Sequence, residues 1–211
     1  MTRLFGDEEA ATVKLGEVTQ GIGYSQLAVQ EAAISSPTRV LNTTIGDFST
    51  IATQEPTGTG DAGKIIVNYG VGGSTSGGEF SVDGAGITTT NAPALDIEYN
   101  FRVDLRLGRA SSPQVAIPLA RFMYASDGIQ GNAVQVGGTF GVEIDDQDTI
   151  WRESFDLDFV PAIGSIFFIE LARDESGNNS SGLLSVQPSG TLSGWNPVPT
   201  ARMRIFRRDL V

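Results

Sequence analysis

Residues 95–107 alternate strictly between apolar and polar side chains. Seven apolar residues occupy every second position from Leu95 to Leu107, and six polar residues separate them. Because successive side chains of a strand point to opposite faces of a sheet, this pattern predicts one long strand with one buried and one polar face. A helix would scatter the same seven residues around its circumference. The chain must therefore build a sheet that covers a core.

Further strand-like segments follow along the chain. They lie at residues 64–71, 79–82, 86–90, 115–124, 134–144, 149–160, 166–173, 182–187 and 200–207. Segments rich in glycine and polar residues separate them, as at 72–78 and 174–182, and these are typical of surface loops and hairpins. With almost no helical pattern in between, the chain is predicted to be all-β, an antiparallel β-sandwich. We expect an eight-stranded jelly roll over residues 38–211.

The first 37 residues differ from the rest. They are rich in Ala, Glu and Gln, and residues 25–34 have the composition of two or three helical turns. Such a segment cannot bury a core alone, so it predicts an extended N-terminal arm, residues 1–37, that orders against a partner. We expect Leu27, Val29 and Ile34 to make that contact. The alternative is a frayed terminus.

The chain contains neither histidine nor cysteine among its 211 residues. This excludes Ser-His-Asp triads, cysteine nucleophiles and thiolate zinc sites. A carboxylate pair is the chief remaining route to catalysis. The pairs Asp156/Asp158 and Asp96/Glu98 have suitable spacing, but both lie on the polar face of a predicted strand, where surface carboxylates are ordinary. We therefore expect no enzyme activity and no catalytic residues.

The formal net charge is −11 and the isoelectric point is about 4.3. This acidity predicts no attraction to nucleic acid or to an anionic membrane surface. No apolar stretch reaches the length of a membrane span, and the acidic residues 7–9 are unlike a signal peptide. We therefore expect a protein of a soluble compartment, without nucleic-acid or membrane partners.

Twelve of the fourteen basic residues are arginines, the residue type best suited to two-pronged carboxylate pairing. Four of them, Arg202, Arg204, Arg207 and Arg208, lie close together near the end of the chain. This predicts ion pairs with carboxylates of a neighbouring subunit or partner protein. The alternative is that the preference for arginine over lysine reflects only a compositional bias. Glu170 lies in an otherwise apolar segment, and we expect it to point outward or to meet one of these arginines.

Two further features have a possible binding role. The three carboxylates of residues 145–148 could supply oxygen ligands to calcium, but the segment lacks the glycine and distal glutamate of the helix-loop-helix pattern. We expect a solvated loop, with no metal and no cofactor. Trp195 lies in a proline-flanked segment and is the better candidate for an exposed sugar-stacking platform. Trp151 is expected in the core or at a subunit interface.

As a whole, the pattern resembles bacteriophage virion accessory proteins. Four features carry the resemblance: the N-terminal arm, a jelly roll rich in Gly, Ser and Thr, the turn from Phe80 to Gly86 that leads into the strand at 95–107, and the closing strand at 201–206. The resemblance covers residues 38–208. The proteins that the chain resembles are trimeric capsid decoration (cement) proteins and head-fibre knobs of the tumour-necrosis-factor-like jelly-roll type.

The resemblance implies a structural virion protein that binds and stabilises the phage head shell. It implies a homotrimer whose N-terminal region grips the major capsid protein, with three jelly rolls around an axis. The protein would be made in the host cytoplasm and reside on the capsid surface. Two alternatives remain: a tail-tube or tail-fibre adaptor subunit, which predicts a ring of six, and a carbohydrate-binding or receptor-binding module that uses Trp195.

Overall fold

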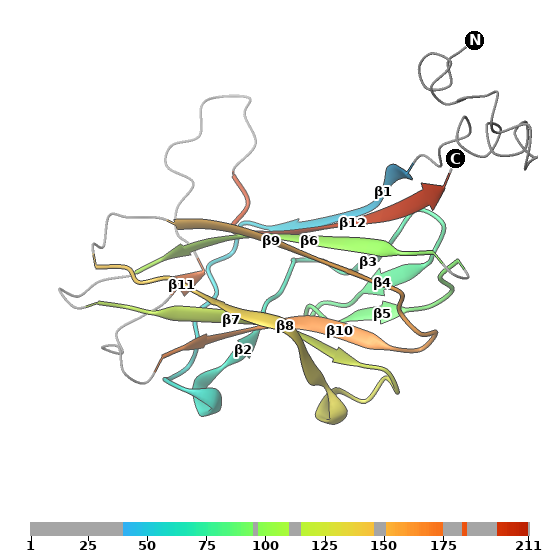
Figure 1. Cartoon of the computed structure of the whole chain (residues 1–211). Helices are drawn as coiled ribbons and strands as arrows, with labels where there is room; N and C mark the ends of the chain where they lie inside the picture. Colours follow the sequence, from blue (N-terminus) through green and yellow to red (C-terminus); the bar gives the residue numbers. More distant parts are fainter. Residues whose placement is uncertain are drawn as a thin grey trace, which may run out of the picture. The chain divides into compact units, whose positions relative to one another are not determined.

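The computed structural model describes residues 40–94, 97–109, 115–145, 151–174, 183–184 and 198–210. These residues form two β-sheets, one of five strands and one of seven, and two short 3-10 helices (Figure 1). Every strand pair with a defined register is antiparallel. The prediction of an all-β chain with antiparallel sheets is therefore confirmed.

The five-stranded sheet contains the strand predicted from the alternating pattern. Its strands are β1 (Val40–Thr50), β12 (Ala201–Leu210), β6 (Tyr99–Gly108), β9 (Trp151–Phe159) and β11 (Leu183–Leu184). β6 pairs with β9 over its whole length, so β12 and the short β11 share its other edge. β1 lies beyond β12 at the edge of the sheet.

The seven-stranded sheet is built around β10, which pairs with three other strands. Its strands are β2 (Ile65–Ile66), β3 (Gly73–Ser74), β4 (Phe80–Val82), β5 (Thr88–Thr90), β7 (Pro118–Ala125), β8 (Val134–Gly141) and β10 (Ile166–Arg173). β7 follows β10 along its whole length, and β5 and β2 share the opposite edge. The 3-10 helices are η1 (Asp61–Gly63) and η2 (Gln130–Asn132).

The strand pairs are nested within one another along the chain. β7 pairs with β8, β6 pairs with β9, β5 pairs with β10, and β1 lies next to β12. Each pair encloses the one before it, and successive pairs alternate between the seven-stranded and the five-stranded sheet. The first half of this set of strands thus pairs in reverse order with the second half, as the two arms of one long hairpin would.

Aromatic side chains from both sheets join in one core. Phe101 of β6 packs against Phe80 of β4, Phe167 of β10 and Phe159 of β9, with ring centroids 5.3, 4.3 and 5.1 Å apart. The other odd-numbered residues of β6 are also buried, whereas its even-numbered residues face away from this cluster. The two sheets therefore enclose the buried face that the alternating pattern predicts.

The apolar segment at residues 166–171 is explained by burial on both faces of β10. Phe167, Ile169 and Leu171 belong to the main core. Ile166 and Phe168 point to the opposite face, where they form a second buried cluster with Met123 and Ala125 of β7. Apart from Glu170, residues 166–171 are apolar because neither face of the strand meets solvent there.

Several predicted boundaries differ from the structure. The described residues contain twelve strands instead of the expected eight, and four of these are the short strands β2 to β5 between β1 and β6. The predicted strand at 64–71 is reduced to β2, the predicted loop at 72–78 contains β3, and no strand-like pattern predicted β1. The expected arm and its boundary at residues 37–38 lie outside the described residues.

Tyr69 offers a test of the core. It is buried, and its hydroxyl has no hydrogen-bond partner among the residues that the structure describes. Burial raises its pKa far above the usual range. Because an unsatisfied buried hydroxyl costs about 1–3 kcal/mol, we expect Tyr69→Phe to raise the free energy of unfolding by about 1 kcal/mol in urea titrations.

Tyr124 provides the matched control. Its hydroxyl accepts a hydrogen bond from the backbone nitrogen of Ala162 at 3.1 Å. Tyr124→Phe removes this bond and should lower the free energy of unfolding by about 0.5–1.5 kcal/mol. A loss of stability in Tyr69→Phe as large as that in Tyr124→Phe would show that the Tyr69 hydroxyl is satisfied after all.

Candidate functional site

The outer face of the five-stranded sheet carries half of the chain's twelve arginines. The odd-numbered residues at 99–107 of β6, 155–159 of β9 and 201–205 of β12 belong to the core, so the even-numbered residues of these strands line the outer face. Its charged residues, termed here the arginine face, are Asp47, Arg102, Asp104, Arg106, Arg152, Asp156, Asp158, Arg202, Arg204 and Arg208. In a chain of net charge −11, this face stands out as rich in positive charge.

Arg202 and Asp47 form a two-pronged ion pair between β12 and β1. The Arg202 Nε donates to Asp47 Oδ1 at 2.8 Å, and Nη2 donates to Oδ2. The hydrogen bond to Asp47 raises the pKa of Arg202, and the charges of Asp47 and Asp104 act in the same direction against a smaller effect of burial. This fork geometry is among the stronger ion pairs in proteins, so Arg202 is engaged within its own chain.

Asp104 is the centre of a second group of contacts. Arg204 Nη2 donates to its Oδ2 at 2.7 Å, the Ser154 hydroxyl donates to its Oδ1, and Arg152 Nη2 lies 3.7 Å from Oδ1. Burial alone would raise the pKa of Asp104, but the hydrogen bonds from Ser154 and Arg204 and the two positive charges outweigh it and lower the pKa. Asp104 is therefore held ionised.

The remaining pairs lie farther along the same strands. Arg208 Nη2 lies 3.2 Å from Asp158 Oδ2, and the amide of Asn100 donates to the other Asp158 oxygen at 2.7 Å. Arg102 Nη2 lies 3.7 Å from Asp156 Oδ2. These carboxylates are the pair Asp156/Asp158 of the sequence analysis, and both face an arginine.

Arg207 differs from the other three C-terminal arginines because its partner is not on the arginine face. Its Nη1 lies 3.3 Å from Oε2 of the buried Glu79, whose Oε1 accepts a hydrogen bond from the Tyr99 hydroxyl at 2.6 Å. Burial first, and then this hydrogen bond, raise the pKa of Tyr99 to about 12. The structure thus brings Arg202, Arg204 and Arg208 to one face and places Arg207 elsewhere, each beside a carboxylate of its own chain.

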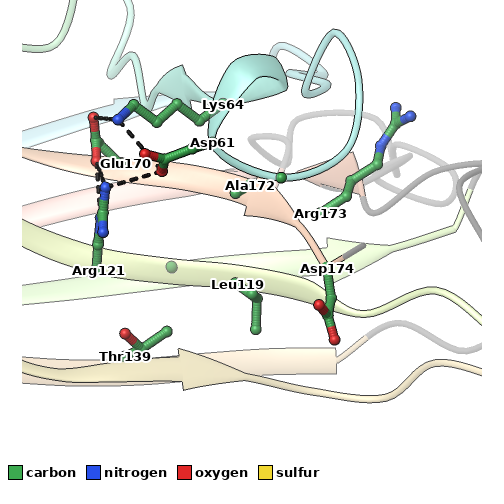
Figure 2. Close-up of a pocket in the computed structure, with 11 residues that line it drawn as sticks. Asp61, Lys64, Leu119, Arg121, Thr139, Glu170, Ala172, Arg173 and Asp174 are labelled. Carbon is green, nitrogen blue, oxygen red and sulfur yellow. Dashed lines mark hydrogen bonds and ion pairs between the residues drawn. The ribbon is translucent and has the colours of Figure 1, made fainter. Parts of the chain in front are cut away.

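A ring of alternating charges lines a small cavity on the other sheet (Figure 2). Glu170 of β10 lies 2.7 Å from Arg121 and 3.1 Å from Lys64. Asp61 lies 3.2 Å from Arg121 and 3.5 Å from Lys64, which closes the ring. The cavity measures about 190 Å³. Two cations and two carboxylates balance, so the ring ties η1 to β7 and β10 without a surplus charge for a ligand.

Sequence reasoning located Glu170 but not its partners. As predicted, it lies on the outer face of β10 with Ile166 and Phe168, but it is buried there, with 8% exposure. The alternative, a pair with a C-terminal arginine, is wrong, since Lys64 and Arg121 are its partners. The orientation of Glu170 follows from the alternation of side chains along the strand. Its partners depend on the pairing of β10 with β7 and β2, which the sequence does not show.

The other candidate residues fall partly outside the described part of the chain. This applies to Leu27, Val29, Ile34 and Trp195, and to residues 146–148 of the acidic segment. Asp145 is exposed. No three acidic side chains gather into a potential metal site within the residues that the structure describes. Trp151 is 46% exposed, so its predicted core position is wrong, and the predicted interface position stays a prediction.

In the described ranges, none of the helical segments has the length and hydrophobicity needed to cross a bilayer. No protein-family model matches this sequence, and a search of curated proteins finds no match to it.

Proposed function

We propose that the chain is a structural virion protein, a capsid decoration or cement protein built as a jelly roll. The observation that carries the proposal is the nested pairing of β7 with β8, β6 with β9, β5 with β10 and β1 with β12. A jelly roll consists of eight strands in two sheets, folded as two Greek keys, and is widespread in viral structural proteins. The nested pairs match that pattern, with β2, β3, β4 and β11 as short additions.

The arginine face supports a role in association between proteins. Arginine is enriched at protein interfaces, where its planar guanidinium both stacks and forms paired hydrogen bonds. Arg102, Arg152 and Arg202 remain substantially exposed, with side-chain exposures of 45%, 71% and 40%. We propose that this face contacts a second subunit in a homotrimer or the major capsid protein of the shell.

Exposed apolar side chains give a second contact region. Ile129, Val160 and Ile163 are each more than half exposed. They lie on neighbouring loops, since a side chain added at Gly128 would meet the carbonyl oxygen of Gly164. Apolar residues gathered at a loop end mark association sites more often than isolated ones do. We propose that these loops form a second contact surface, beside the arginine face, in the assembled particle.

Native mass by light scattering, with and without EDTA, tests the assembly. We expect a stable trimer with a mass near three times 22.3 kDa that chelation leaves unchanged. A ring of six would favour the tail-tube or adaptor alternative. A monomer that binds sugars on a glycan array, and loses this binding in Trp195→Ala, would favour the carbohydrate-binding alternative.

A variant without residues 1–36 separates assembly from docking in the same experiment. The variant should remain a trimer, with a mass lower by the 36 deleted residues of each subunit, because the proposed subunit contacts lie in the sandwich. It should no longer cosediment with capsid shells that retain the full chain, because the proposed arm grips the shell. Cosedimentation of both chains would contradict the proposed role of the arm.

A further inference from the structure

The pairing of β6 with β9 places two arginines directly opposite each other. Arg106 faces Arg152 across the two strands, whereas Arg102 faces Asp156 and Asp104 faces Ser154. Like charges at directly opposed positions destabilise a sheet, and opposite charges stabilise it. Along β6 and β9 this is the one like-charged position, whereas on the other side of β6 Arg102 lies opposite Arg204 of β12.

The carboxylates nearby do not compensate these two arginines. Asp104 is shared between Arg204 at 2.7 Å and Arg152 at 3.7 Å, and Asp47 is taken by Arg202. Arg106 forms no ion pair with any described residue, and its Nη1 is buried without a hydrogen-bond partner there. Among the described residues, Arg152 and Arg204 share the carboxylate of Asp104 and Arg106 has none, so the three guanidinium groups exceed this carboxylate by about two positive charges.

The unbalanced charges line a cavity. It measures about 360 Å³, and Asp104, Arg106, Arg152, Val198, Pro199 and Arg202 surround it. Asp104 is the one carboxylate among the described residues of this wall, and Arg204 and Ser154 bind its oxygens, which limits its repulsion of an anion. Guanidinium groups offer paired donors that match the oxygens of a phosphate group. At physiological salt the distant acidic surface is screened over about 8 Å, so these local charges dominate.

We propose that this cavity binds a dianionic oxyanion of the phosphate type, with Arg106 and Arg152 as its principal ligands. The doubly negative charge of such a group equals the surplus of the cluster, and its oxygens supply the missing hydrogen-bond acceptors. A phosphate ion and the phosphoryl group of a monoester share this chemistry. Arg152 and Arg202 also belong to the arginine face proposed above as a protein contact, but the anion site is inferred from the cavity itself and does not depend on that contact.

Isothermal titration of the full chain with inorganic phosphate tests the site, at pH 7.5 and with ionic strength held constant by sodium chloride. We expect saturable binding with one site per chain. Arg106→Gln and Arg152→Gln should each weaken the affinity at least tenfold. Arg102→Gln is the matched control, because Arg102 lies on the same face of β6 but pairs with Asp156 outside the cavity wall. Its affinity should stay within twofold of the parent chain.

Two further titrations identify the class of anion. Acetate, with a single charge, should bind at least tenfold more weakly than phosphate, and phenyl phosphate serves as the esterified form. Saturable binding of either phosphate supports the site, and the tighter one identifies the free or the esterified group. Absence of saturable binding, equal affinity of Arg106→Gln and Arg102→Gln, or equal affinity for acetate and phosphate would each overturn the proposal. Arg152 is 71% exposed, so Arg152→Gln should fold even where Arg106→Gln does not.

Discussion

Replacing Phe101 by alanine is expected to lower the free energy of unfolding by about 3–5 kcal/mol. Its ring lies at the centre of the core, in contact with Phe80, Phe159 and Phe167 from both sheets. Truncation would remove these contacts and leave a cavity that three aromatic neighbours cannot fill, because each is held by its own strand. Denaturant titration followed by far-ultraviolet circular dichroism would measure the change as a shift of the midpoint.

Two comparison variants define what this loss means. Phe101→Leu retains most of the volume and should lose clearly less stability than Phe101→Ala. Ile129→Ala removes an apolar side chain that is 57% exposed and should change stability by less than about 0.5 kcal/mol. If Phe101→Ala cost no more than Ile129→Ala, the two sheets could not share the core described above.

A large loss is also expected for Gly86→Ala, in the turn between β4 and β5. Gly86 is buried and has a φ of +92°, which is costly by about 1–2 kcal/mol for a residue with a side chain. A Cβ atom there would lie 2.0 Å from the carbonyl oxygen of Val67, so backbone has to move. With about 1–3 kcal/mol for such overpacking, we expect Gly86→Ala to lower the free energy of unfolding by about 3 kcal/mol.

Gly84 in the same turn provides the control. No atom lies within 4 Å of a Cβ placed there, and it has no positive φ. Gly84→Ala should therefore change stability by less than about 1 kcal/mol, since only the entropy of the unfolded chain is affected. Thermal melts of the two variants, recorded side by side, compare them directly, and equal melting temperatures would contradict the close approach of Val67 to Gly86.

Strands with a regular pattern could be predicted from the sequence. β10 occupies the predicted residues 166–173. β6 begins at Tyr99, inside the predicted strand at 95–107, and ends at Gly108, one residue beyond the predicted end. Both patterns reflect the physical rule that adjacent side chains of a strand face opposite ways. β1 was missed because its sequence, VLNTTIGDFST, mixes small, polar and apolar residues without alternation. Its strand conformation depends on its place beside β12 at the sheet edge.

For the charged residues, the sequence predicts the type of contact but not the partner residue. The C-terminal arginines were expected to pair with carboxylates of a neighbouring subunit or partner protein, whereas the structure gives each of the four a carboxylate within its own chain. Which carboxylate faces which arginine depends on strand register, and so does the opposition of Arg106 and Arg152. Register is a property of paired strands far apart in sequence, and no local pattern encodes it.

The nested pairing also dictates how this chain must reach its folded state. Only eight residues, which include η2, separate β7 from β8, so this pair can close first, whereas Thr50 at the end of β1 meets Thr200, 150 residues away. Chains dominated by such distant contacts fold slowly, on the millisecond-to-second scale, because each closure of a long loop costs entropy before its contacts form. During synthesis β1 emerges early and waits for residues 201–210, so its backbone stays unpaired longest. The interval before β12 arrives is therefore when this protein is most open to pairing with the wrong strand.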